Sequence, residues 1–145
     1  MGRLSGSATV QTLAAMLVVT LVYRGLEAAV TLLPVFSFPV SGLFVLAPTF
    51  PATPWTLLTS VYAHAGVGHL LGNALTLAFV GFLLERSTTN ARYHAFFVVA
   101  GVLAGLAQVV VTGSAVLGAS GAIFALVGYV VTAHPVSEVA FSPLR

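Results

Sequence analysis

Four long apolar stretches dominate the chain, and each ends at polar residues or at proline. They cover residues 8–33, 66–84, 93–111 and 117–133. A helix that crosses the ~30 Å hydrocarbon core of a bilayer needs about 20 mostly apolar residues. The pattern therefore predicts four membrane-spanning helices joined by short connections.

The first stretch contains two charges, Arg24 and Glu27. They are three residues apart, so a helix places them on one face, where they can pair or where Arg24 can reach the interface. A cleaved signal peptide is the alternative for this stretch. It is less favoured, because the stretch is long and no small-x-small cleavage site follows.

The segment of residues 34–54 lies between the first two stretches and breaks the helical pattern. It has prolines at positions 34, 39, 48, 51 and 54, interspersed with phenylalanines. This density of proline excludes a straight helix, yet the segment is too apolar for an ordinary solvated loop. It predicts an extended or re-entrant connection in the membrane interface, anchored by aromatic residues such as Trp55.

Composition supports a membrane protein and excludes several other classes. Of 145 residues, 59% are hydrophobic and 6% are charged, and the mean hydropathy is +1.08. A soluble surface needs many more charges. A net charge of +2 forms no basic patch for nucleic acid. The absence of cysteine excludes disulfides and thiolate metal sites.

The arginines predict an orientation in the membrane. With four spans, Arg3, Arg86, Arg92 and Arg145 fall on one side of the bilayer, and only Arg24 belongs to the other half. Cytoplasmic loops carry the excess of positive charge. Both termini are therefore expected in the cytoplasm.

Three polar residues at the start of the second span are candidates for function. They are His64, His69 and Asn73, and the last two are four residues apart on one helical face. Polar side chains within spans are costly and often functional. The alternative is that they only join helices by hydrogen bonds. A metal site is disfavoured because no acidic residue accompanies them, and no motif for a cofactor is present.

Ser120 opens the fourth span within the sequence Gly118–Ala122, which is Gly-Ala-Ser-Gly-Ala. A serine at a helix N-terminus lies among free backbone N–H groups that suit an oxyanion. The alternative is an N-terminal cap with small residues for close helix packing. Four alternating spans put Ser120 and His69 near the same side of the membrane, which favours the chemistry of acyl transfer.

These motifs together resemble the rhomboid family of intramembrane serine proteases. The resemblance is carried by Trp55–Ser60, by His64, His69 and Asn73 in the pattern H-x4-H-x3-N, by Gly81–Arg86, by Gly118–Ala122 and by Gly128-Tyr129, in that order. It implies an all-α, six-helix bundle of which this chain holds the first four helices, in one incomplete domain over residues 1–145.

The resemblance also implies roles for these residues. Ser120 would be the nucleophile, and its backbone N–H, His69 and Asn73 would stabilise the oxyanion. His64 would lie at the polar entrance of the site. Phe124 would pack against the general base, and Glu85 would be structural. The substrates would be transmembrane helices of other proteins in the bilayer, cleaved without a cofactor.

The chain departs from the family at the general base, which the family places on a sixth span. His134 lies fourteen residues after Ser120 on the same predicted helix, which at ~1.5 Å per residue is about 21 Å away. His94 lies at the same end as His134. The chain is therefore expected to be truncated and inactive as written. The alternative function is a pseudoprotease that binds transmembrane helices, and Gly101 and Gly105 suit either internal packing or a homo-oligomer.

Overall fold

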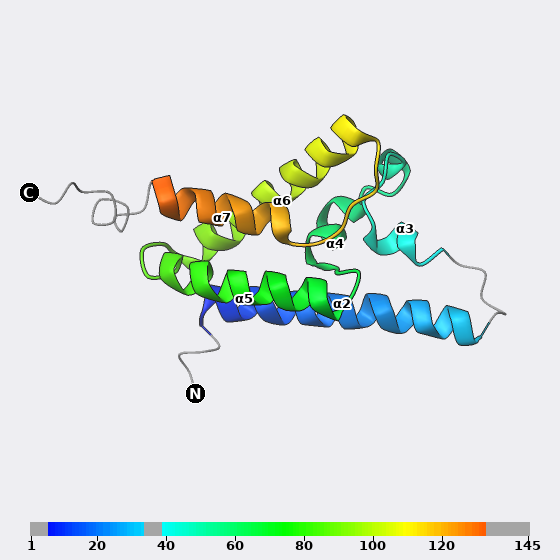
Figure 1. Ribbon diagram of the computed structural model, residues 1–145, viewed down its shortest axis with the longest axis horizontal. Helices are drawn as coiled ribbons and strands as arrows, with labels where there is room; N and C mark the ends of the chain where they lie inside the picture. Colours follow the sequence, from blue (N-terminus) through cyan, green and yellow to red (C-terminus); the bar gives the residue numbers. More distant parts are fainter. Residues whose placement is uncertain (1–5, 34–38, 133–145) are drawn as a thin grey trace, which may run out of the picture.

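The computed structural model describes residues 6–33 and 39–132, and within these ranges every regular element is helical (Figure 1). The elements in chain order are α2 (Ala8–Leu32), α3 (Ser41–Phe44), the 3₁₀ turn η1 (Phe50–Ala52), α4 (Thr56–Tyr62), α5 (Val67–Leu84), α6 (Asn90–Thr112) and α7 (Ser120–Thr132).

Three of the helices, α2, α5 and α6, are long and apolar enough to cross a membrane. They correspond to the first three predicted spans, and their boundaries differ from the predicted ones by at most three residues. The predicted fourth span coincides with α7, which is apolar but has 13 described residues. Its predicted last residue, Ala133, and the nearby His134 lie outside the described residues.

The start of α7 differs from the predicted one. The apolar pattern places it at Leu117, whereas the helix begins at Ser120. Two features hold the preceding residues out of the helix. Val116 pairs with Leu46 in an isolated antiparallel bridge, and Gly118 has a φ of 120°, which is not helical.

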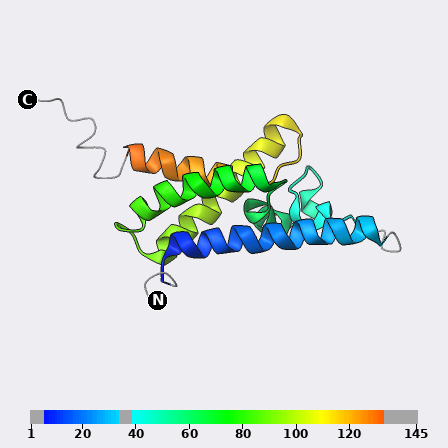
Figure 2. The ribbon, with the colours of Figure 1, turned by 60° about the horizontal axis from the view of Figure 1, so that its bottom comes forward.

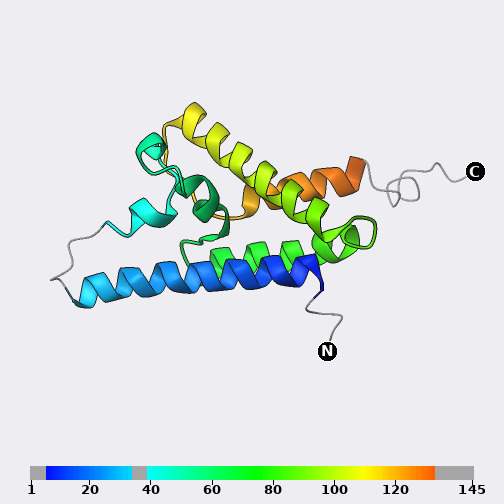
Figure 3. The same cartoon turned by 180° about the vertical axis from the view of Figure 1, so that it is seen from behind.

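The helices pack in a closed order around the core. α2 contacts α5, α5 contacts α7, α7 contacts α6, α6 contacts α4, and α4 returns to α2. Figure 2 shows α5 lying between α2 and α7. Figure 3 shows α6 crossing the bundle at an angle, from the α5–α6 connection toward the end where α3 and α4 lie. This arrangement brings the start of α7 beside α4 and the start of α5.

The Glu85 carboxylate joins two segments at one end of the bundle by hydrogen bonds. Glu85, just after α5, accepts hydrogen bonds from the Ser7 hydroxyl at 2.8 Å and from the Thr9 backbone N–H at 3.0 Å. Burial alone would raise the pKa of Glu85, but the bonds from Thr9 and Ser7 outweigh it and lower that pKa. The N-terminus of α2 and the α5–α6 connection therefore share one end of the bundle, as predicted.

Close helix contacts in the core depend on glycine. A Cβ on Gly101 would lie 2.7 Å from Val61 Cγ1, and a Cβ on Gly121 would lie 2.4 Å from Ala104 Cβ. A Cβ on Gly105 would lie 3.0 Å from Leu46 Cδ2. Both glycines of the Gly101–Gly105 pair thus face neighbours within the chain, which supports internal packing as the use of this pattern.

The proline-rich segment is more ordered locally than predicted. Of residues 34–54, positions 34–38 lie outside the described residues, and the rest includes α3 and η1. The Trp55 indole donates a hydrogen bond to the Gly42 carbonyl at 3.0 Å, and the Thr59 hydroxyl donates one to the Leu43 carbonyl at 2.6 Å. These bonds attach α3 to α4. The purely extended or re-entrant interpretation omitted both short helical turns.

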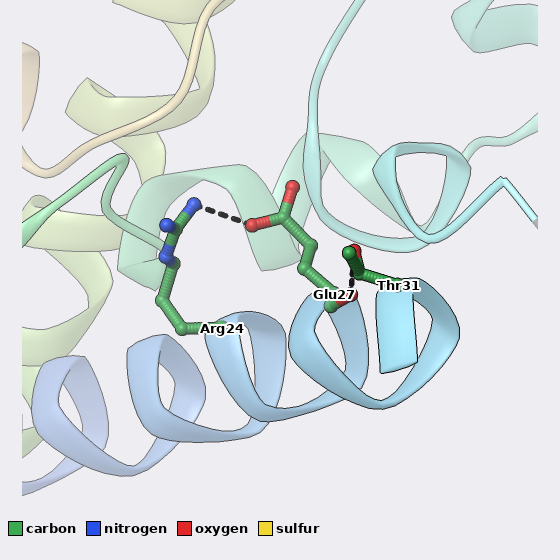
Figure 4. Close-up of polar contacts among 3 residues, drawn as sticks. All are labelled: Arg24, Glu27 and Thr31. Carbon is green, nitrogen blue, oxygen red and sulfur yellow. Dashed lines mark hydrogen bonds and ion pairs between the residues drawn. The ribbon is translucent and has the colours of Figure 1, made fainter. Parts of the chain in front are cut away.

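The two charges within α2 form an ion pair, as one of the two predicted arrangements requires. Arg24 points toward the carboxylate of Glu27, and the Thr31 hydroxyl donates to the Glu27 backbone carbonyl (Figure 4). The pair lines a cavity of about 670 Å³ between α2 and α3. Both side chains are substantially exposed, at 54% and 32%.

Candidate active site

Ser120 is the first residue of α7 and is half-buried. The carbonyl of Ala119 accepts the first hydrogen bond of the helix, from the Ile123 N–H at 3.0 Å. The N–H groups of the first turn have no carbonyl of the preceding turn to bind, and they point out of the helix N-terminus. The hydroxyl of Ser120 therefore lies at a positive helix end, where an anion is stabilised.

The residues just before Ser120 are fixed from two sides by backbone hydrogen bonds. Leu46 and Val116 exchange N–H to carbonyl bonds of 3.0 and 2.8 Å, and the Gly118 N–H donates to the Ser60 carbonyl at 2.7 Å. One partner comes from the proline-rich segment and the other from α4. These contacts determine where the chain enters α7.

Gly118 lies directly against the His69 ring. A Cβ on Gly118 would lie 2.6 Å from His69 Cε1, 2.8 Å from His69 Nε2 and 3.7 Å from Asn73 Nδ2. With its φ of 120°, Gly118 also has a conformation that residues with a side chain rarely adopt. The glycine thus allows the backbone before Ser120 to approach the His69 and Asn73 side chains of α5.

Asn73 carries an unused hydrogen-bond donor at this point. Its Nδ2 atom is buried and has no hydrogen-bond partner among the described residues. A buried donor without a partner is costly and needs an explanation. A negatively charged oxygen bound beside Gly118 would provide the missing acceptor. The pattern H-x4-H-x3-N thus brings His69 and Asn73 to the Gly-Ala-Ser segment that sequence analysis paired with them.

His64 lies in the connection between α4 and α5, and its side chain is buried. The resemblance places it at the polar entrance of the site, whereas its side chain is 0% exposed. Its ring lies edge-on to that of His69, with centroids 5.0 Å apart. The Gly66 turn allows α5 to start after His64, so the two histidines approach the α7 segment from different elements. His64 is therefore a buried residue in contact with His69 and Ala119.

Both ring nitrogens of His64 have partners. Nε2 lies 3.4 Å from the Ala119 N–H donor, and Nδ1 lies 3.0 Å from the Tyr62 carbonyl and 3.2 Å from the Thr20 hydroxyl. Since Nε2 accepts, the ring proton belongs on Nδ1. Burial, and to a smaller extent the nearby His69, lower the pKa of His64 from 6.5 to about 4. His64 is thus a neutral imidazole at ordinary pH.

A cavity of about 330 Å³ lies beside Ser120 between α6 and α7. Gly118, Ser60, Gln108 and Phe124 are among the residues that line it. Phe124, one turn after Ser120, is 72% exposed. The cavity gives a polar group access to the Ser120 hydroxyl from the side of α6.

The remaining histidine among the described residues lies at the other end of the bundle. His94 Nε2 is 2.8 Å from the Gln11 amide oxygen, and His94 Nδ1 is 3.4 Å from the Thr12 hydroxyl. These contacts join the start of α6 to α2, near the Glu85 end. His94 thus lies within α6 and contacts α2, far from Ser120. Residues 6–33 and 39–132 contain no group of three residues suited to a metal ion.

Sequence analysis missed two contributors to the site because both act through the backbone. Leu46 and Ser60 hold Val116 and Gly118 by main-chain bonds, so their side chains give no chemical signal. The Trp55–Ser60 motif was the available clue for Ser60. No pattern in the sequence indicated that Leu46 pairs with Val116.

Comparison with known proteins identifies the family of the chain. A family model, the Rhomboid domain, matches residues 51–144. Among curated proteins, rhomboid protease GluP of Bacillus subtilis is 38% identical over 74 residues. RHOMBOID-like protein 1 of Arabidopsis thaliana is 36% identical over 75 residues, and Rhomboid-related protein 1 of Caenorhabditis elegans is 31% identical over 87 residues.

These matches are partial with respect to the relatives. They cover 51%, 51% and 59% of this chain, but 15%, 19% and 24% of the three relatives in the same order. The chain thus spans well under half the length of each relative. The domain match itself covers more than half of the chain and includes every residue of the site from Ser60 to Ser120. The chain is therefore a member of the rhomboid family of multi-pass membrane proteins.

Proposed function

We propose that this chain carries the nucleophile and oxyanion site of a rhomboid-type intramembrane serine endopeptidase. The observation that carries the proposal is the unpartnered, buried Nδ2 of Asn73, next to His69 and the Gly118 backbone that leads into Ser120. A donor left without a partner in the free protein is available to an oxygen that becomes negative during the reaction.

The chemistry follows from these groups. Ser120 Oγ attacks the carbonyl carbon of a peptide bond, and its proton passes to a general base. The carbonyl oxygen becomes an oxyanion that accepts hydrogen bonds from the Ser120 N–H, the His69 ring and the Asn73 amide. Collapse of this intermediate expels the amine, which takes up the proton, and leaves an acyl ester on Ser120. Water then hydrolyses the ester to a carboxylic acid and regenerates the hydroxyl.

The substrate in this proposal is a transmembrane helix. The long, apolar helices α2, α5 and α6 place the site within a membrane protein, and a peptide bond reaches Ser120 only if its helix unwinds locally. Segments rich in glycine unwind at lower cost. The positively charged Arg86 and Arg92 at the Glu85 end support a cytoplasmic orientation of that end, and with it of both termini, as part of the proposal.

Reactivity of Ser120 tests the nucleophile. The purified chain in detergent is incubated with a fluorophosphonate probe, and the modified residue is mapped by mass spectrometry. Because the chain is proposed to lack the base that deprotonates Ser120, labelling should be slow and is followed over prolonged incubation. We expect a single adduct on Ser120 that Ser120→Ala abolishes, while Ser114→Ala, in the exposed loop before α7, leaves labelling unchanged. Absence of the adduct from the folded chain contradicts the proposal and leaves the helix-binding pseudoprotease as the function.

Turnover is a separate question because it needs a base. His64 is buried with both nitrogens occupied, and His94 lies at the other end of the bundle. The chain as written is therefore proposed to cleave very slowly, since loss of the base in a serine protease costs several powers of ten in rate. A model substrate with a glycine-rich transmembrane segment tests this. Cleavage that disappears in Ser120→Ala would show that a base is present.

A further inference from the structure

The buried His64 ring is the only side chain among the described residues with a hydrogen bond to the backbone that leads directly into Ser120. Its Nε2 accepts from the Ala119 N–H at 3.4 Å, and both residues are 0% exposed. Its Nδ1 is held by the Tyr62 carbonyl and by Thr20 from α2. His64 thus connects α2, the end of α4 and the residue before the nucleophile.

The position of Ala119 determines the direction of the Ser120 N–H. The peptide group between these residues is planar and trans, so its C=O and N–H point in opposite directions. The Ala119 carbonyl points along α7 to the Ile123 N–H. The Ser120 N–H must therefore point backward, out of the helix N-terminus. Any rotation of the Ala119 backbone turns this donor away from the oxygen that it is to bind.

A single tautomer is required for this contact. If the ring proton were on Nε2, it would face the Ala119 N–H, and two donors would oppose each other in a buried site. The Tyr62 carbonyl and the Thr20 hydroxyl select the Nδ1 proton, because the carbonyl accepts and offers no proton. The groups around the ring are the His69 ring, the Tyr62 carbonyl and the Thr20 hydroxyl, and none of them carries a negative charge that would favour a protonated imidazole.

We propose that His64 is a positioning residue, which fixes the Ala119 backbone so that the Ser120 N–H is aimed at the oxyanion. This inference rests on the proposed function of Ser120. It assigns His64 an action through Ala119 and no contact with the substrate. It predicts that changes at His64 weaken binding of the tetrahedral state more than binding of the intact substrate helix.

Two amide substitutions separate the functions of the two ring nitrogens. The Oε1 of glutamine is as many bonds from Cα as Nε2 of histidine, so His64→Gln retains an acceptor for Ala119. The Nδ2 of asparagine is as many bonds from Cα as Nδ1, so His64→Asn retains the donor to Tyr62 and loses the acceptor. Both variants place a polar amide in the same buried space, so each controls for the other.

Affinity for a peptidyl boronate, which forms a tetrahedral adduct on serine, is measured beside affinity for an uncleaved transmembrane peptide. We expect His64→Asn to weaken boronate binding by about 10- to 100-fold and His64→Gln by less than about threefold, as misaimed oxyanion donors typically cost. Binding of the transmembrane peptide should change by less than about twofold in both.

Equal boronate affinities in the two variants, or parallel losses of boronate and peptide binding, would refute the positioning role while the proposed function stands. No boronate adduct on Ser120 in the unsubstituted chain would overturn the proposed function and this inference with it. The ¹⁵N spectrum of the His64 ring tests the inference without any variant. A proton on Nδ1 is expected, and a proton on Nε2 would overturn it.

Discussion

Removal of the Glu85 carboxylate should destabilise the bundle far more than removal of another glutamate. Glu85 accepts from the Ser7 hydroxyl at 2.8 and 3.1 Å and from the Thr9 N–H at 3.0 Å. It also places a negative charge at the positive N-terminus of α2. A hydrogen bond to a charged group contributes about 1.5–3 kcal/mol. Partial exposure reduces this, so Glu85→Ala should cost about 2–3 kcal/mol.

Glu27→Ala is the matched control. The Glu27 carboxylate pairs with Arg24 of the same helix, and this ion pair is exposed (Figure 4). Exposed pairs contribute about 0–1 kcal/mol. Unfolding by sodium dodecyl sulfate in mixed micelles, followed by far-ultraviolet circular dichroism, gives the free energy of unfolding of each variant. Equal losses in the two variants, or no loss in Glu85→Ala, would refute the reasoning.

Three further predictions concern the site. Gly118→Ala should reduce fluorophosphonate labelling by about 100-fold or more, because the new Cβ would lie 2.6 Å from the His69 ring. Gly113→Ala is the control: Gly113 has a φ of 67° but open space around it. This variant should retain labelling and lose about 1 kcal/mol of unfolding free energy. The free energy of unfolding should fall by roughly 2–4 kcal/mol as the pH falls from 6.5 to about 4. The reason is that the unfolded chain takes up a proton at position 64 in this range, whereas folded His64, with its pKa of about 4, does not. Denaturant titrations at each pH should show this pH dependence in the unsubstituted chain and not in His64→Gln. Asn73→Leu should fold at least as well as the unsubstituted chain by circular dichroism, since it removes an unpartnered buried donor; a large loss of folded protein would show that Asn73 joins helices instead.

The long helices were predictable because a membrane span has a simple requirement, a run of about 20 apolar residues. α2, α5 and α6 therefore begin and end close to the predicted positions. The start of α7 was predicted three residues too early, since Leu117 is as apolar as the helix itself. Hydropathy does not register the backbone pairing of Val116 with Leu46 or the positive φ of Gly118.

The proximity of the candidate site residues was predictable only in part. The spacing of His69 and Asn73 puts them on one helical face, and the structure brings both to Gly118. The position of His64 was not predictable from spacing. It precedes α5, so its ring direction depends on partners from Thr20 and Ala119, which are distant in sequence. Tertiary contacts of this kind leave no periodic signal in the chain.

The account depends most on the claim that Asn73 Nδ2 and the Ser120 N–H donate to an oxyanion. Nuclear magnetic resonance of the ¹⁵N-labelled chain observes both groups before and after a peptidyl boronate reacts with Ser120. Because Asn73 Nδ2 has no acceptor among the residues that the structure describes, its side-chain N–H resonance should move downfield on adduct formation, together with the Ser120 backbone N–H. An adduct on Ser120 that leaves both resonances unmoved would contradict the account.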